Sequence, residues 1–159
     1  LVSVTNGEYS RIDAGWLRSQ GSGERYLYVA DGKPGHGCST SITDAVVHMN
    51  GRKVYNFAVK AMCDTVEFLI SKNGTGIESI DYIVPHQANI RIIEAAGKRL
   101  GIPRETFYTN MEEYGNTSAA SIPIALNEML EQDLLKRGDI ILTIGFGGGL
   151  TYGGNLIHW

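Results

Sequence analysis

Long apolar segments are missing from this sequence: no uninterrupted apolar run exceeds five residues. A transmembrane helix needs about 20 predominantly apolar residues, and the chain does not open with a charged-then-apolar leader. We therefore expect no membrane insertion and no export signal.

Cysteine is also scarce, with two residues, Cys38 and Cys63. A disulfide scaffold of the secreted type uses more cysteines than this, and Cys63 lies in a strongly helical stretch. We therefore expect both residues to be free thiols in the reducing cytoplasm.

The sequence has no excess of positive charge: it contains 14 Lys and Arg residues and 17 Asp and Glu residues, which gives a net charge of −3. This balance argues against broad nucleic-acid binding, although it is compatible with a local basic patch for a small acidic partner. His36, His48 and His158 have no metal-ligand spacing with one another or with the cysteines, so we expect no metal site.

What the chain does contain is enough apolar material for one domain, since 43% of its 159 residues are hydrophobic and 19% are charged. It starts at Leu1 with an apolar stretch of strand character that has no preceding turn or cap. We expect the sequence to be a piece of a longer protein.

Apolar periodicity predicts strands alternating with helices, and hence an α/β fold. Apolar residues spaced by three and four, such as Met62 and Leu69, predict a long helix over residues 53–72 that ends at Asn73 and Gly74. A tight glycine turn joins the last two strands, which we expect to be antiparallel. Further strands are predicted at residues 1–5, 12–17, 25–30, 80–84, 106–109, 140–144 and 151–159. Further helices are predicted at residues 88–100 and after residue 116. The second of these helices has Pro123 in its first turn, and its inward-facing residues are expected to be Ile122, Leu126, Met129 and Leu130.

The strand predicted at residues 80–84 is followed directly by Pro85 and His86. Proline cannot donate to a sheet ladder, so the strand ends there and His86 falls at its carboxyl end, where open α/β sheets bind ligands. A lone histidine is more often a hydrogen-bonded structural residue. Asn89 and Arg91 follow at the start of the next helix, whose free N–H groups favour a polar or anionic ligand, and they favour a functional role for His86.

Asn116 lies in a run of small polar residues just before a predicted helix. The run is a good N-cap sequence, and on local grounds capping is the favoured role. Alternatively, His86 and Asn116 at the ends of two strands present two hydrogen-bond donors to one carbonyl oxygen.

Glycines are concentrated in residues 145–149 (GFGGG). A dinucleotide-binding loop requires a helix after the glycines, whereas here a strand follows. The alternative is a turn whose backbone approaches a ligand or a neighbouring backbone closely.

A basic patch is predicted on the helix at residues 88–100. Arg91 and Lys98 are seven residues apart and share a face, with Arg99 adjacent. Such charges usually form a solvated face, and they favour a docking patch for an acidic carrier only if His86 is catalytic.

Three motifs, in order, resemble β-ketoacyl-acyl-carrier-protein synthase III: VPHQANIRII at residues 84–93, YGNTSAASIP at residues 114–123 and GFGGGLTYGGNLIHW at residues 145–159. The segment MNGRKVYNFAV at residues 49–59 is also similar to this family. The resemblance implies one half of a thiolase-like α/β fold, with a mixed βαβαβ-type sheet and helices packed on its faces. It divides the chain into residues 1–48, strands and a linker at the junction with a missing N-terminal half, and residues 49–159, the C-terminal condensing-enzyme domain.

The resemblance implies a Cys-His-Asn triad. His86 matches the histidine of the family's PHQAN motif and Asn116 the asparagine of its GNTSAAS motif, whereas the nucleophilic cysteine belongs to the N-terminal half. Cys38 and Cys63 match neither the position nor the context of that nucleophile. The isolated chain is therefore expected to be inactive.

The implied reaction is a decarboxylative Claisen condensation of acyl-CoA with malonyl-acyl carrier protein, which initiates fatty acid synthesis without a tightly bound cofactor. His86 and Asn116 would hydrogen-bond the malonyl thioester oxygen, and the Gly148 N–H would complete the oxyanion hole for the acyl-cysteine. Gly51 and Asn89 would touch the phosphopantetheine arm of the thioester substrates. The resemblance further implies a cytoplasmic homodimer whose Arg91, Lys98 and Arg99 meet the acidic carrier protein.

Two alternatives stay open at the level of the sequence. One is a related synthase of polyketide or quinolone type that uses the same triad on another acyl thioester. The other is a module that binds a carrier protein without catalysis.

Overall fold

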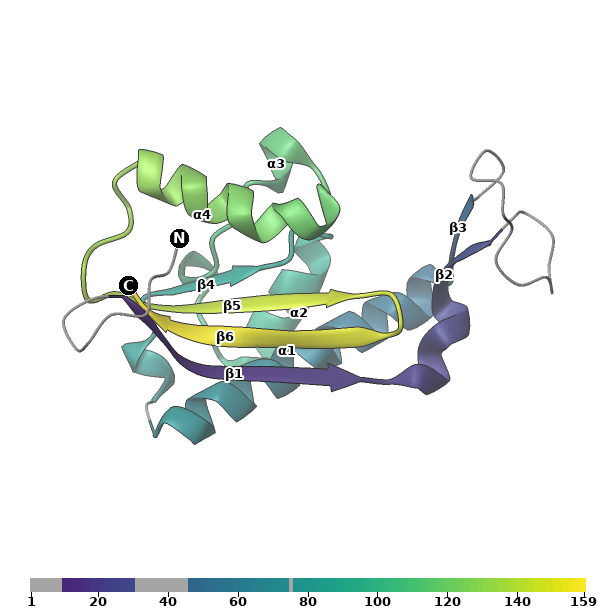
Figure 1. Ribbon diagram of the computed structural model, residues 1–159, viewed down its shortest axis with the longest axis horizontal. Helices are drawn as coiled ribbons and strands as arrows, with labels where there is room; N and C mark the ends of the chain where they lie inside the picture. The colour runs from purple at the N-terminus through teal and green to yellow at the C-terminus, as the bar shows by residue number, and fades with distance from the viewer. Residues whose placement is uncertain (1–9, 31–45, 75) are drawn as a thin grey trace.

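A computed structural model describes residues 10–30, 46–74 and 76–159 (Figure 1). The strand predicted at residues 1–5, the linker at residues 31–37 and Cys38 lie outside the described residues. Among the described helices, none is long and apolar enough to span a membrane.

The main sheet has four strands in the order β1-β6-β5-β4. These are β1 (Arg11–Ser19), β4 (Tyr82–Pro85), β5 (Ile140–Gly147) and β6 (Thr151–His158). β4 and β5 are parallel, whereas β5 and β6 are antiparallel, as the glycine turn predicts, and β1 is antiparallel to β6. The mixed α/β sheet is therefore confirmed. The domain boundary predicted between residues 48 and 49 stays a prediction. β1, which precedes this boundary in the chain, pairs along its length with β6, which follows it.

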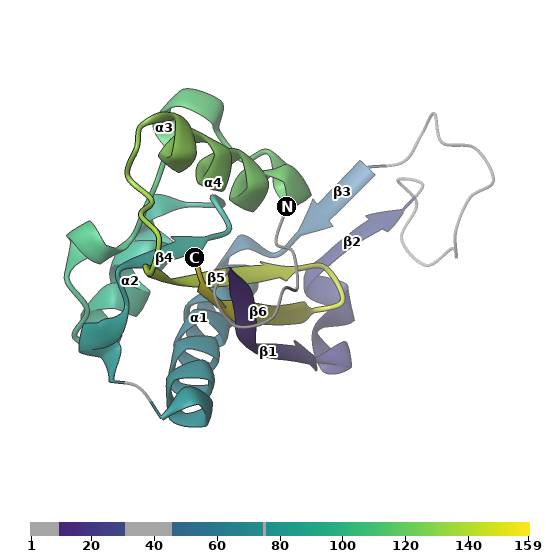
Figure 2. The ribbon, with the colours of Figure 1, turned by 60° about the vertical axis from the view of Figure 1, so that its left-hand side comes forward.

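A second, two-stranded sheet extends beyond the end of the main sheet (Figures 1 and 2). It pairs β2 (Leu27–Ala30) with β3 (Val46–Met49) and follows the 3-10 helix η1 (Gly21–Tyr26). Val29 and Val47, which face each other in this ribbon, are 65% and 70% exposed. The ribbon therefore presents apolar side chains to the surroundings.

Helices cover both faces of the main sheet (Figure 2). On one face, α1 (Gly51–Asn73) and α2 (Ile90–Leu100) pack on the core side chains of Leu142, Ile144 and Leu156. On the other face, α4 (Ser121–Glu131) packs on Val84, Ile141 and Ile157. Because neighbouring side chains of a strand point to opposite faces, burial on both sides explains why β5 is apolar without alternation.

The long helix predicted from apolar spacing is confirmed as α1. Ala58, Met62, Val66 and Leu69 are at most 1% exposed, and Gly74 ends the helix in the left-handed conformation (φ 68°). α2 starts later than predicted, at Ile90, because the side chain of Asn89 accepts a hydrogen bond from the Arg91 N–H and caps the helix. Gly101 ends α2 in the same left-handed conformation.

Two local predictions are wrong. Residues 106–109 do not form a strand beside β4: a single bridge joins Ile83 to Phe107, after which the buried Gln87 side chain bonds the Tyr108 carbonyl and the Asn110 N–H in place of a strand partner. Leu130, expected inside, is 44% exposed, because the inner face of α4 is formed by residues such as Ala125 and Met129. Short elements complete the chain: η3 (Ile77–Ser79), η4 (Arg104–Thr106), α3 (Met111–Tyr114) and η5 (Ser118–Ala120).

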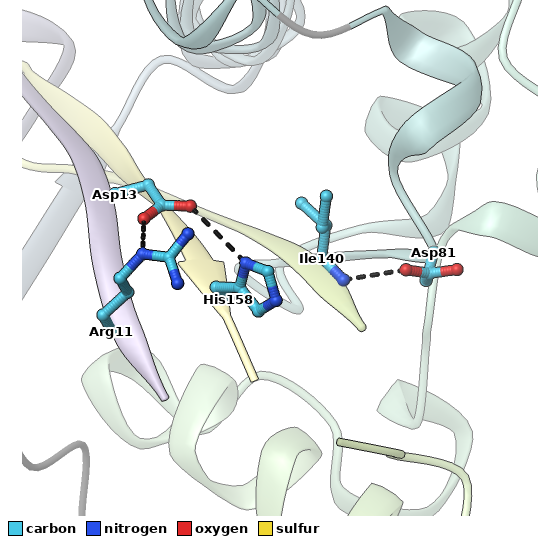
Figure 3. Close-up of polar contacts among 5 residues, drawn as sticks. All are labelled: Arg11, Asp13, Asp81, Ile140 and His158. Carbon is cyan, nitrogen blue, oxygen red and sulfur yellow. Dashed lines mark hydrogen bonds and ion pairs between the residues drawn. The ribbon is translucent and has the colours of Figure 1, made fainter. Parts of the chain in front are cut away.

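Polar contacts join the strands at the end of the sheet where β4 and β5 begin (Figure 3). Asp13 of β1 pairs with Arg11 and approaches His158 Nδ1 of β6 to 3.9 Å. The Asp81 carboxylate accepts a 2.7 Å hydrogen bond from the Ile140 N–H at the start of β5. Ion pairs near the surface contribute little stability. We therefore infer that these contacts mainly align the strands, at the end of the sheet opposite to the candidate site.

Gly154, in the middle of β6, has no room for a side chain, and Gly154→Ala is expected to lower the free energy of unfolding by about 3 kcal/mol. A Cβ there would lie 2.2 Å from the Thr143 carbonyl oxygen and 2.8 Å from Thr65 Cγ2. The matched control is Gly21→Ala, where a Cβ meets nothing within 4 Å, and it should stay within about 0.5 kcal/mol. Equal urea midpoints for the two variants would contradict this packing.

Candidate functional site

The candidate site lies where β4 and β5 both finish, which we call the carboxyl end of the sheet (Figure 1). Pro85 is the last residue of β4, in register with Ile144, so the strand runs one residue further than predicted. The next residue, His86, donates its backbone N–H to the Ile144 carbonyl at 2.7 Å. The main chain of His86 is therefore fixed to β5, and its side chain belongs to the end of the sheet where α/β folds place ligands.

The His86 imidazole is half-buried and has two defined neighbours. Its Nδ1 lies 2.7 Å from the Ser121 hydroxyl at the start of α4. The Phe146 ring of β5 packs edge-on, with ring centroids 5.2 Å apart and an interplanar angle of 73°. Burial lowers the pKa of His86 below its ordinary value. The ring is therefore neutral at pH 7, which leaves one nitrogen a donor and the other an acceptor.

We expect an NMR titration of this chain to give His86 a midpoint below that of an unhindered histidine, which is about 6.5. Because the unfolded chain takes up the proton first, His86 lowers stability as the pH falls from above 6.5 towards the folded midpoint, and it has no effect at higher pH. A midpoint above the ordinary value would show that His86 has a charged partner instead.

Gln87 is a site residue that the sequence reasoning missed. Its side chain is 1% exposed and fully paired: Nε2 donates to the carbonyls of Pro85 (2.8 Å) and Tyr108 (3.2 Å), and Oε1 accepts from the Asn110 N–H (3.2 Å). It ties the end of β4 to the segment that leads into α3. An amide two residues after the proline that ends an apolar strand was the available signal for a buried hydrogen-bonding role.

The same segment is also fastened to α4. Asn110 donates from Nδ2 to the Glu128 carboxylate at 2.6 Å. Burial, together with the nearby Glu128 carboxylate, raises the pKa of Tyr108 to about 12. Tyr108 is thus a neutral hydroxyl. The segment at residues 108–110, which leads through α3 to Asn116, is anchored to Gln87 at the end of β4 and to Glu128 of α4.

Asn116 follows Gly115, the residue that caps the C-terminus of α3 with a φ of 65°. The Asn116 side-chain oxygen accepts a 3.0 Å hydrogen bond from the Ser118 N–H, two residues on, which is an Asx-turn contact. The N-cap residues of η5 and α4 are Thr117 and Ala120, so the capping role favoured on local grounds is wrong for Asn116. Asn116 is exposed and lies five residues before Ser121, the residue that contacts His86. With its oxygen engaged, Nδ2 is the end of the amide that can donate to a ligand.

The glycine turn joins β5 to β6 at the same end of the sheet. Gly149 requires glycine, because its φ is 127° and a Cβ would lie 3.2 Å from the Thr151 backbone nitrogen. Gly148 is exposed, and a Cβ there would lie an ordinary 3.7 Å from the Leu27 carbonyl. The conformation and packing of the turn therefore require glycine at position 149 but not at position 148. A glycine at position 148 agrees with a backbone N–H that is kept accessible to a ligand.

Two helix N-termini carry the residues predicted to contact the phosphopantetheine arm. Gly51 is the first residue of α1, whose N-cap Asn50 accepts a hydrogen bond from the Lys53 N–H, and Asn89 caps α2. Gly51 and Asn89 are both exposed. The Tyr55 hydroxyl of α1 donates to the Arg91 carbonyl of α2 at 3.3 Å, so the two helix starts are neighbours.

The basic residues predicted on α2 are all exposed. Arg91 lies in the first turn, and Lys98 lies about 10 Å further along the helix axis. Arg99 lines a groove between α1 and α2 with Glu67 and Ile70, so it faces α1 more than Lys98 does. Among the described residues there is no cluster of three or more His, Cys, Asp or Glu side chains that could hold a metal ion.

Cys63 is not placed for chemistry. It lies within α1, is 1% exposed, and burial raises the pKa of its thiol. A thiol nucleophile requires access and a lowered pKa. The site therefore contains a neutral histidine and an asparagine but no nucleophilic cysteine among the described residues.

Known proteins match the chain along its length. Residues 70–159 match the family described as 3-oxoacyl-[acyl-carrier-protein (ACP)] synthase III C terminal. The chain is 44% identical over 160 residues to the β-ketoacyl-[acyl-carrier-protein] synthase III of Clostridium acetobutylicum, covering 99% of this chain and 49% of the relative. The corresponding protein of Natranaerobius thermophilus is also 44% identical, over 100% of this chain and 50% of the relative.

Two solved structures agree with these matches. The crystal structure of 3-oxoacyl-[acyl-carrier-protein] synthase III from Aquifex aeolicus superposes with a TM-score of 0.86 at 36% identity, covering 99% of this chain and 47% of that one. The synthase III structure from Thermus thermophilus gives a TM-score of 0.84 at 41% identity, covering 99% and 48%. The chain spans about half the length of each of these proteins.

Proposed function

Because this chain belongs to the 3-oxoacyl-[acyl-carrier-protein] synthase III family, whose C-terminal part it matches, we propose that it supplies half of the active site of a condensing enzyme. The thiolase-like α/β fold that the motifs predict is confirmed by the two solved structures. The observation that carries the proposal is a neutral His86 at the carboxyl end of the sheet, with its backbone fixed to β5 and Asn116 in a segment anchored beside it.

The proposed reaction is a decarboxylative Claisen condensation that initiates fatty acid synthesis. An acyl group from acyl-CoA is first transferred to the cysteine of the N-terminal half, with release of CoA. Malonyl-carrier protein then binds and loses carbon dioxide. The electron pair of the broken carbon–carbon bond forms an enolate, which attacks the acyl thioester and expels the cysteine thiolate, giving 3-oxoacyl-carrier protein.

His86 and Asn116 stabilise the enolate step. Negative charge develops on the malonyl thioester oxygen as carbon dioxide leaves, and each hydrogen-bond donor aimed at that oxygen is worth a few kcal/mol. A neutral imidazole suits this role, because it donates without the cost of burying a cation. The accessible backbone at Gly148 supplies an N–H for the oxyanion of the acyl-cysteine.

Substrate delivery uses the helix starts of α1 and α2. Gly51 and Asn89 flank the entrance for the phosphopantetheine arm of CoA and of the carrier protein. Arg91, next to this entrance, and Lys98 and Arg99 further along α2 form a basic surface for an acidic carrier protein. A local basic surface of this kind is compatible with the net charge of −3 of the whole chain.

The catalytic cysteine comes from the other half of the protein. Cys63 is inaccessible within α1, and the exposed apolar ribbon of β2 and β3 is consistent with a surface that a further segment covers. We place the assembled enzyme in the cytoplasm as a homodimer, without a tightly bound cofactor.

The proposal is tested with acyl-CoA and malonyl-acyl carrier protein as substrates. The full-length protein that contains this chain should release carbon dioxide and form 3-oxoacyl-carrier protein, whereas the 159-residue chain alone should do neither. Condensation by the rigorously purified chain would refute the need for a second half. Absence of both products with the full-length protein would refute the proposed reaction.

A further inference from the structure

We propose that Ser121 is a positioning residue that holds His86 in the tautomer with its proton on Nε2. The inference concerns which His86 nitrogen donates, and its role in catalysis rests on the proposed function. Ser121 is the first residue of α4 and is 2% exposed. It belongs to the helix that packs on the Val84 and Ile141 face of the sheet, and it contacts His86 at the carboxyl end.

The hydroxyl of Ser121 has two contacts, and their donor roles can be worked out. Its Oγ lies 2.7 Å from His86 Nδ1 and 3.3 Å from the backbone nitrogen of Gln87. A backbone N–H can only donate, so the Ser121 oxygen accepts from Gln87. The hydroxyl proton then needs an acceptor, and among the described residues Nδ1 of His86 is the one in contact with it.

The opposite assignment leaves a buried donor without a partner. If Nδ1 carried the proton, the Ser121 oxygen would receive two N–H donors, and its own proton would have no acceptor among the described residues. Buried hydroxyl protons without partners are unfavourable. The contacts therefore favour Ser121 O–H donating to Nδ1, which leaves the His86 proton on Nε2, the nitrogen that Ser121 does not contact.

This tautomer is the one that the proposed chemistry needs. With its proton on Nε2, His86 presents an N–H to the substrate side, where it can bond an oxygen that gains negative charge. With the proton on Nδ1, the same nitrogen would present a lone pair to that oxygen. Ser121 is well placed to fix the choice, because α4 is held against β4 and β5 by the buried Ala125 and Met129.

The test is ¹⁵N NMR of the ring nitrogens in the 159-residue chain, with His86 assigned by loss of its signals in His86→Gln. We expect Nδ1 of His86 at the chemical shift of an unprotonated nitrogen and Nε2 at that of a protonated one. Ser121→Ala should move both shifts towards a mixture of tautomers, whereas Ser121→Thr, which keeps the hydroxyl, should restore them. A protonated Nδ1 in the unaltered chain would overturn the proposal outright.

The control is Ser79→Ala, which removes a half-buried hydroxyl that bonds the Gly76 carbonyl, away from the site. It should leave the His86 shifts unchanged. The His158 shifts report that each variant is folded. If Ser121→Ala leaves His86 unchanged while His158 shows a folded chain, Ser121 does not select the tautomer.

A kinetic measurement on the full-length protein separates this inference from the proposed function. Ser121→Ala should slow malonyl decarboxylation about tenfold or more, leave acyl transfer to the cysteine unchanged, and be rescued by Ser121→Thr. The expected NMR shifts without any decarboxylation by the unaltered protein would refute the proposed function and leave the tautomer assignment intact. Decarboxylation that survives Ser121→Ala undiminished would refute the role of Ser121 alone.

Discussion

Replacing His86 by Ala in the full-length protein should lower the rate of malonyl decarboxylation by about 10²- to 10³-fold, the usual loss for one donor to a developing oxyanion. The cysteine should still accept the acyl group from acyl-CoA, because His86 is assigned to the malonyl thioester oxygen. The two half-reactions are measured separately, the first as carbon dioxide released and the second as acyl-enzyme by mass spectrometry.

The matched control for this prediction is His158→Ala. His158 lies on β6 at the end of the sheet opposite to the site, with a 3.9 Å approach to Asp13 (Figure 3). Its replacement should leave decarboxylation within a factor of two or three, since a surface pair of this kind contributes about 0–1 kcal/mol. If both half-reactions persist in His86→Ala, the assignment of His86 is wrong.

The second large effect is expected on stability, from Gln87→Leu. Leucine matches the glutamine approximately in size but removes all three hydrogen bonds of the buried amide, so the carbonyls of Pro85 and Tyr108 and the Asn110 N–H lose their partner. Each buried polar group left unpaired costs about 1–3 kcal/mol. We expect a loss of about 3–4 kcal/mol in the free energy of unfolding, measured by urea denaturation.

Gln132→Leu provides the comparison, because Gln132 is exposed at the end of α4 and makes one 3.4 Å contact with Glu128. It should change stability by no more than about 0.5 kcal/mol. A similarly small loss for Gln87→Leu would mean that the segment at residues 107–110 is held by its apolar contacts, such as that of Phe107, and not by the amide.

Much of the framework could be predicted from the sequence, because it depends on local signals. The spacing of Met62 and Leu69 and the αL preference of Gly74 define α1 without reference to the rest of the chain. Pro85 marks the end of β4, and the glycine turn after Phe146 predicts the antiparallel pairing of β5 and β6. Each of these features needs only a few consecutive residues.

The features that could not be predicted depend on residues far apart in the chain. The segment at residues 107–110 has the composition of a strand, yet its pairing with β4 stops because Gln87, 20 residues earlier than Phe107, takes up its polar groups. Leu130 has the spacing of a buried residue, but the rotation of α4 on the sheet places Ala125 inside instead. Such choices are made by packing and not by local propensity.

The candidate site shows the same division. The sequence places His86 at a strand end and Asn116 before a helix, and the structure adds what each atom of these residues bonds. The Asn116 oxygen is occupied by the Ser118 N–H, and His86 Nδ1 is occupied by Ser121. The donor direction of both side chains follows from these two contacts, and neither contact is visible in the sequence.

The central claim is that His86 and Asn116 donate to one and the same oxygen, and a double-mutant cycle on malonyl decarboxylation tests it most directly. The rates of the full-length protein, His86→Ala, Asn116→Ala and the double variant are compared as activation free energies. Two donors that act as a unit should be non-additive, with a coupling energy of about 1 kcal/mol or more. Additivity within about 0.5 kcal/mol would show that the two residues act on different groups and would contradict the shared site.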